Sequence, residues 1–140
     1  MYKKILLAAD GSEHSLRAAG KAAGLAKLAG EDAIIEIVYV VDFETEKNDV
    51  LRNINQESIK EERQRRLQLT EGKINAAGVK SKTIVMHGDP GPTLVSYANE
   101  NDFDILILGS RGLNALQEMV LGSVSHKVVK RAQCPVMIVK

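Results

Sequence analysis

The 140-residue sequence has little of what several classes of protein depend on. Its single cysteine, Cys134, cannot form an internal disulfide, and no cysteine-based metal motif is present. The three histidines, His14, His87 and His126, lack the spacing of a metal-binding pair. The net charge of +1 gives no electrostatic footprint for nucleic acid and no basic patch for a membrane surface. The charged segment 60–69 alternates in sign, so we interpret it as a solvated helix face rather than a binding tail.

Long apolar runs are absent as well. The first apolar run ends at Asp10 after five residues, which is shorter than the core of a signal peptide. No other stretch reaches the length that spans a membrane. We therefore expect a cytoplasmic protein. Its length and its 44% hydrophobic content predict a single packed domain over residues 1–140.

Five short apolar runs are present, and several are continuous rather than alternating. Continuous runs are typical of strands that are covered on both faces, as in parallel sheets. Helix-like segments separate the runs, which predicts an α/β domain with a mainly parallel sheet and right-handed crossovers. The expected strands are residues 4–9, 33–41, 82–86, 104–108 and 135–139.

Capping and turn residues mark the expected helices. The first helix follows a possible N-cap at Ser12 and ends at Gly30, and the second ends at Gly78. Pro92 is a favoured first residue for the third helix, and Ser123 begins the fourth. Basic residues near the end of the fourth helix suit the helix dipole. The polar stretch before the second helix is expected to be a loop.

A glycine-rich stretch follows the fourth expected strand, at the edge where open α/β sheets bind ligands. Gly109 and Gly112 come directly after the strand, and Gly122 and Ser123 lie where the last helix begins. Glycine can adopt positive φ and lets a ligand approach the backbone closely, and a helix N-terminus attracts phosphate. Arg111 would add a cation. The pattern indicates an anion site, with turns and tight packing as the alternative explanation.

Two common phosphate-binding motifs are absent, namely G-x-x-x-x-G-K-[ST] and G-x-G-x-x-G after the first strand. The pattern G-x2-G-x9-G-[ST], formed by Gly109, Gly112, Gly122 and Ser123, instead resembles the ATP-binding motif of the universal stress protein family. The resemblance covers the chain from "KILLAADGSEHS" to "LGSVSHKVVKRAQCPVMIV". It implies a Rossmann-like α/β fold: an open five-stranded parallel sheet, in strand order 3-2-1-4-5, with helices on both faces.

The resemblance also implies roles for individual residues in binding ATP, or AMP or ADP. Asp10 would contact the ribose side of the nucleoside, Ala8 would line the base pocket, and Val40 would meet adenine partly through its backbone. A divalent ion such as Mg²⁺ could accompany the phosphates. The alternative for Asp10 is a cap on the helix that starts at Ser12. The residues implied for the ribose floor and the phosphates are Leu108, Gly109, Arg111, Gly112, Gly122, Ser123, Val124 and Ser125.

The last strand would lie at an edge of the sheet in the implied order. An apolar edge invites pairing with another chain unless it is covered. The resemblance implies a homodimer that forms through this strand, with Val136, Ile138 and Val139 as candidate contacts. The alternative is a monomer whose edge is protected by Lys140.

The favoured hypothesis is an ATP-binding universal stress protein that acts as a nucleotide-linked sensor or regulator of the stress response. An alternative is a slow ATPase or phosphotransferase that uses His126 or Arg111. Against it, the sequence shows no recognisable catalytic base and no clear set of metal-holding carboxylates. A further alternative is an interaction module that binds no nucleotide, and the complete glycine motif argues against this.

Overall fold

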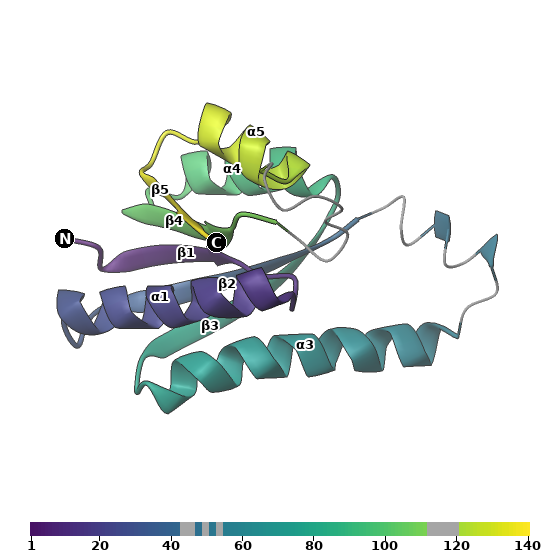
Figure 1. The fold of residues 1–140 in the computed structure, drawn as a ribbon, viewed down its shortest axis with the longest axis horizontal. Coiled ribbons are helices and arrows are strands. Elements are labelled where there is room, and N and C mark those ends of the chain that lie inside the picture. The colour runs from purple at the N-terminus through teal and green to yellow at the C-terminus, as the bar shows by residue number, and fades with distance from the viewer. Residues whose placement is uncertain (43–46, 49–50, 53–54, 112–120) are drawn as a thin grey trace.

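The protein forms a five-stranded parallel sheet with the strand order β3-β2-β1-β4-β5 (Figure 1). The computed structural model describes residues 1–42, 47–48, 51–52, 55–111 and 121–140. Both the α/β fold class and the strand order expected from the sequence are confirmed. The strands are β1 (Lys4–Ala8), β2 (Ile34–Val41), β3 (Lys80–His87), β4 (Ile105–Gly109) and β5 (Val136–Val139).

Helices cover both faces of the sheet (Figure 1). One face carries α1 (Glu13–Ala29) and α3 (Gln56–Ala76), and the other carries α4 (Pro90–Glu100) and α5 (Ser123–Arg131). No helix in the described part of the chain is long and apolar enough to cross a membrane.

Two apolar cores lie on opposite sides of the sheet. Ile5 and Leu7 of β1 point into the core beneath α1, and Leu6 between them points into the core beneath α4 and α5. Since alternate side chains of one strand enter different cores, every position in the run must be apolar. This accounts for the continuous runs in the sequence. The face that α1 buries is made almost entirely of alanines: Ala18, Ala19, Ala22, Ala23 and Ala26.

The ends of the helices follow the capping residues, with one correction. The Ser12 side chain caps α1 by accepting a hydrogen bond from the Ser15 N–H at 3.1 Å. Gly30, with φ of +119°, and Gly78, with φ of +73°, follow α1 and α3. The prediction that the third helix begins at Pro92 was wrong, because α4 begins at Pro90. Proline suits the whole first turn of a helix, where N–H groups lack intrahelical partners, so the first of two prolines sets the start.

Strand β3 also begins before its apolar run. Lys80 pairs with Ile34 of β2, two residues ahead of the expected start of the strand. Polar side chains are compatible with this position because β3 lies at an edge of the sheet and its burial alternates. Backbone pairing therefore extends the strand beyond what hydropathy indicates.

The one charged residue inside β2, Glu36, is buried and has a partner. The Tyr97 hydroxyl of α4 donates a hydrogen bond to Glu36 Oε1. Burial and this hydrogen bond raise the pKa of Tyr97 to about 12. Glu36 is not among the residues that line the cavity described below.

Candidate functional site

A cavity of about 720 Å³ lies at the carboxyl ends of β1, β2 and β4. Its walls also include the first half of α3 and the starts of α4 and α5. This volume is in the range of pockets that bind small molecules. The position is the one expected for an open α/β sheet, where the order of the strands reverses beside β1.

The fold brings the candidate binding residues together from four separate segments. Gly112 lies outside the described residues, and all the other candidates line the cavity. These are Ala8, Asp10, Val40, Leu108, Gly109, Arg111, Gly122, Ser123, Val124 and Ser125. That they line one cavity is an observation, and that they bind a nucleotide stays a prediction.

Asp10 has a structural role in the turn between β1 and α1. Its Oδ1 accepts a hydrogen bond from the Ser12 N–H at 2.9 Å, and its own N–H donates to Ser15 Oγ at 3.1 Å. These contacts support the alternative in which Asp10 shapes the start of α1. Asp10 also lines the cavity, so the two roles are compatible.

The N-terminus of α5 opens toward the cavity without a side-chain cap. Gly122 is the N-cap residue, and it makes no side-chain capping hydrogen bond. Ser123, Val124 and Ser125 form the first turn of α5, and all three line the cavity. The first N–H groups of a helix lack intrahelical acceptors and carry partial positive charge. This turn is therefore suited to an anion.

Positive φ does not explain the described motif glycines. Gly122 has φ of −61° and ψ of 160°, an extended conformation that other residues also adopt. Gly109 is not among the glycines with positive φ, which are Gly11, Gly30, Gly78 and Gly88. Of the two properties of glycine considered from the sequence, positive φ is therefore not used at Gly109 or Gly122. Their lack of a side chain, rather than their backbone freedom, must be the relevant property.

Close packing explains Gly109. A Cβ atom added there would lie 2.7 Å from His14 Cβ and 2.9 Å from the His14 carbonyl carbon. The Gly109 carbonyl accepts a hydrogen bond from Ser125 Oγ at 2.7 Å. In this structure the Ser125 hydroxyl thus joins α5 to β4, and the role of Ser125 in phosphate binding stays a prediction.

His14 lies at the junction of α1 with the segment after β4. Its Nε2 atom is 2.8 Å from Arg111 Nη2, and its Nδ1 atom is 3.3 Å from Ser110 Oγ. The His14 side chain is half-buried. The contact spans 97 positions of the sequence and cannot be inferred from the first turn of α1 alone.

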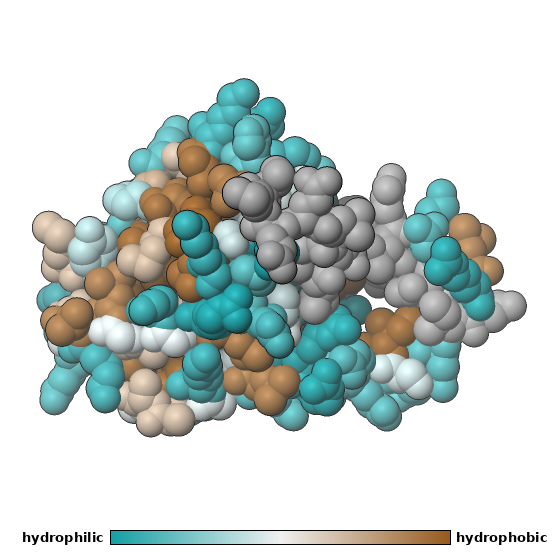
Figure 2. Space-filling model, viewed as in Figure 1, coloured by the Kyte–Doolittle hydropathy of each residue, from teal (hydrophilic) through white to brown (hydrophobic). Residues whose placement is uncertain are grey.

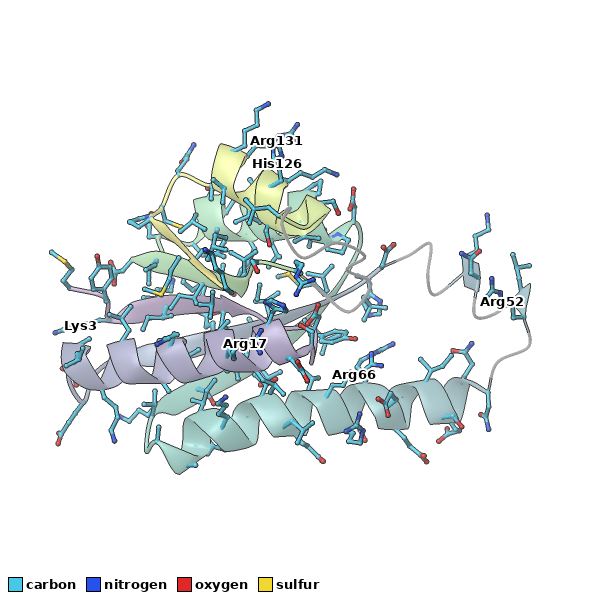
Figure 3. The ribbon with its side chains drawn as sticks, in the orientation of Figure 1. Lys3, Arg17, Arg52, Arg66, His126 and Arg131 are labelled. Atoms are coloured by element: carbon cyan, nitrogen blue, oxygen red, sulfur yellow. The ribbon has the colours of Figure 1, made fainter. Side chains whose placement is uncertain are left out.

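Helix α3 contributes two cationic residues that the sequence analysis missed. Arg63 and Arg66 line the cavity, so segment 60–69 is not solvated throughout. The buried residues of α3 lie only in its second half, and its first half extends beyond the sheet (Figure 1). The Arg66 side chain rises from α3 toward the carboxyl end of the sheet (Figure 3). The sequence offered only a cluster of arginines on a helix without an apolar stripe, and this pattern does not tell a cavity wall from a solvated surface.

Glu62 partly neutralises this wall of the cavity. Its Oε1 atom lies 2.7 Å from Arg65 Nη2 and 3.2 Å from Arg66 Nε. The hydrogen bond from Arg65 is the main cause that lowers the pKa of Glu62. The side chain of Arg66 also packs over Gly11, where an added Cβ would lie 2.6 Å from Arg66 Cβ. The wall is thus a connected charged network that contacts the turn between β1 and α1.

The remaining candidates for chemistry lie away from the cavity lining. His126 is exposed and extends from α5 on the side of the molecule opposite α3 (Figure 3). His87 is exposed at the end of β3, and Cys134 is half-buried against the core beneath α4 and α5. Burial raises the pKa of the Cys134 thiol. Within the described ranges, no group of three or more His, Cys, Asp or Glu side chains is arranged to hold a metal ion.

Comparisons with known proteins agree with the resemblance seen in the sequence. The model of the universal stress protein family matches residues 1–140. Universal stress protein YxiE of Bacillus subtilis is 35% identical over 155 residues, covering 100% of both chains. The structure of MJ0577, from Methanocaldococcus jannaschii, has a TM-score of 0.86 and 31% identity, covering 100% of this chain and 96% of that one. A universal stress protein solved in complex with cAMP has a TM-score of 0.71 and 26% identity, covering 99% and 97%.

Proposed function

This chain belongs to the universal stress protein family, and on that premise we propose that it binds ATP in the cavity beside β1 and β4. The observation that carries the proposal is the uncapped N-terminus of α5, which lines this cavity together with Arg111. A helix N-terminus and a guanidinium are both suited to phosphate. The relative solved with cAMP supports an adenine nucleotide as the ligand class.

Each part of the cavity suits one part of the nucleotide. Val38 and Val40 at the end of β2 offer an apolar surface for the base. Asp10, which follows β1, also lines the cavity, and it would accept a hydrogen bond from the ribose. The first turn of α5 and Arg111 would receive the phosphates, and any accompanying Mg²⁺ would be held mainly by those phosphates.

The geometry favours a protein that holds its nucleotide over a hydrolase, and family membership is what suggests that it acts as a regulator in the stress response. Hydrolysis needs a group that positions a water molecule beside the terminal phosphate. Among the described residues that line the cavity there is no histidine, and of the three carboxylates, Asp10, Asp42 and Glu62, the first and the last have other roles. Asp10 forms the turn before α1, and Glu62 is paired with Arg65 and Arg66. We therefore propose that the protein holds the nucleotide and responds to its binding.

The nucleotide content of the purified protein tests this proposal. Protein purified without added nucleotide is denatured, and the released small molecules are separated and identified by chromatography with ultraviolet detection. We expect close to one ATP per chain, and we expect it to persist as ATP during incubation of the native protein. Absence of nucleotide, together with no binding when ATP is added back, would contradict the proposal. Rapid conversion to ADP would favour the ATPase alternative.

We also propose that two chains pair through β5. This strand pairs only with β4 in the described chain, so its other edge is available. Of the three candidate contacts, Val136 and Ile138 are half-buried, whereas Val139 is buried in the core beneath α1. Figure 2 shows apolar side chains gathered on the surface around this strand. Sedimentation equilibrium should give twice the mass of one chain at micromolar concentration. The mass of a single chain under those conditions would count against pairing.

A further inference from the structure

His14 of α1 contacts two residues of the segment that follows β4. Arg111 Nη2 lies 2.8 Å from His14 Nε2, and Ser110 Oγ lies 3.3 Å from His14 Nδ1. A guanidinium can only donate hydrogen bonds, so Nε2 must be the acceptor. The ring proton is then assigned to Nδ1, from which it points to the Ser110 hydroxyl oxygen. The two nitrogens of a neutral imidazole therefore have different partners.

The surroundings hold this imidazole in place. The Ser110 N–H donates to the Val139 carbonyl at 2.8 Å, and the Ser110 carbonyl accepts from the Gly122 N–H at 2.9 Å. Ser110 is buried, so its hydroxyl is a fixed partner for the ring. On the other side, the backbone and Cβ of His14 lie against Gly109. The ring is thus anchored to β4, β5 and the start of α5.

We propose that His14 is a positioning residue that holds the Arg111 guanidinium at the wall of the cavity, ready to meet a phosphate group. This inference rests on the proposed nucleotide binding and extends it, because His14 does not itself line the cavity. An arginine side chain loses much rotamer freedom when it is fixed on a ligand. Fixing it before the ligand arrives removes part of that cost from binding. The histidine would therefore favour phosphorylated ligands over the nucleoside.

Two substitutions of His14 distinguish the effect of its hydrogen bond to Arg111 from the effect of the volume that its ring fills. His14→Met keeps a long side chain and removes the acceptor, whereas His14→Gln keeps an acceptor oxygen. The affinities for ATP and for adenosine are measured by titration calorimetry. We expect His14→Met to lower the affinity for ATP about two- to tenfold, which is the range for ordering one long side chain. The affinity for adenosine should not change. His14→Gln should retain most of the affinity for ATP. Glu13→Gln, an exposed neighbour on α1, is the matched control.

A double-mutant cycle with Arg111→Ala tests whether His14 acts through Arg111. Without the guanidinium, His14→Met should cause no further loss of ATP affinity. An equal loss in both backgrounds would overturn the inference, as would an unchanged affinity in His14→Met alone. Unchanged adenosine affinity shows that a variant is folded and that its base site is intact. If the wild-type protein binds neither ATP nor adenosine, the proposed function fails and this inference fails with it.

Discussion

Replacing Gly122 with valine should abolish ATP binding and leave the fold intact. Gly122 has φ of −61° and ψ of 160°, which valine adopts without strain. It is only half-buried, so we expect the added side chain to be accommodated near the surface, with a loss of about 1 kcal/mol from the poorer N-cap. A valine side chain would instead stand at the N-terminus of α5, where phosphate must approach the N–H groups. Loss of two charge-assisted hydrogen bonds at about 1.5–3 kcal/mol each corresponds to at least about 100-fold in affinity.

Calorimetry with ATP measures this loss, and urea denaturation without nucleotide measures stability. Gly122→Ala should give an intermediate affinity, since a methyl group blocks less of the approach. Leu121→Val is the matched control, because Leu121 is exposed and does not line the cavity. Wild-type affinity in a folded Gly122→Val protein would remove the α5 N-terminus from the binding site.

The sequence predicted the sheet well because its strands are buried on both faces. Ile5, Leu6 and Leu7 are fully buried in two different cores, so their apolar character is compulsory and visible in the sequence. The boundaries were less predictable where burial is partial. Lys80 extends β3 by backbone pairing alone, and hydropathy carries no signal for that.

The candidate site was predictable where its residues directly follow a strand or begin a helix. Asp10 and Gly109 could be placed because parallel strands bring their carboxyl ends to one edge. Arg63 and Arg66 could not, since a charged helix surface has the same local pattern whether it faces solvent or a cavity. The contact of His14 with Arg111 joins segments far apart in the chain, and no local periodicity encodes it.

The two described glycines of the motif, Gly109 and Gly122, therefore meet different physical requirements, although they belong to one sequence pattern. Gly122 is a half-buried N-cap with an ordinary extended backbone, and its lack of a side chain leaves the start of α5 open. Gly109 lies against the first turn of α1. Phosphate binding and tight packing were alternatives in the sequence. In the structure, packing explains Gly109, and we propose that Gly122 keeps the phosphate approach open.

Gly109→Ala should consequently destabilise the fold itself. The new Cβ would lie 2.7 Å from His14 Cβ and 2.9 Å from the His14 carbonyl carbon, and a backbone atom cannot yield as a flexible side chain can. Overpacking of this kind costs about 1–3 kcal/mol, measured as the free energy of unfolding in urea. Movement of α1 would also displace His14, so ATP affinity should fall in the same variant.

Gly24→Ala provides the matched control for this prediction. Gly24 is an exposed residue of α1, and a Cβ added there meets nothing within 4 Å. Alanine favours the helix over glycine by roughly 0.5–1 kcal/mol, so this variant should be more stable than the wild type. If the two substitutions change the free energy of unfolding in opposite directions, the lack of space beside His14, and not the loss of a glycine as such, determines the stability of Gly109→Ala. If Gly109→Ala were as stable as the wild type but bound no ATP, Gly109 would instead be a glycine that contacts the ligand. Packing against α1 would then not explain why position 109 requires a glycine.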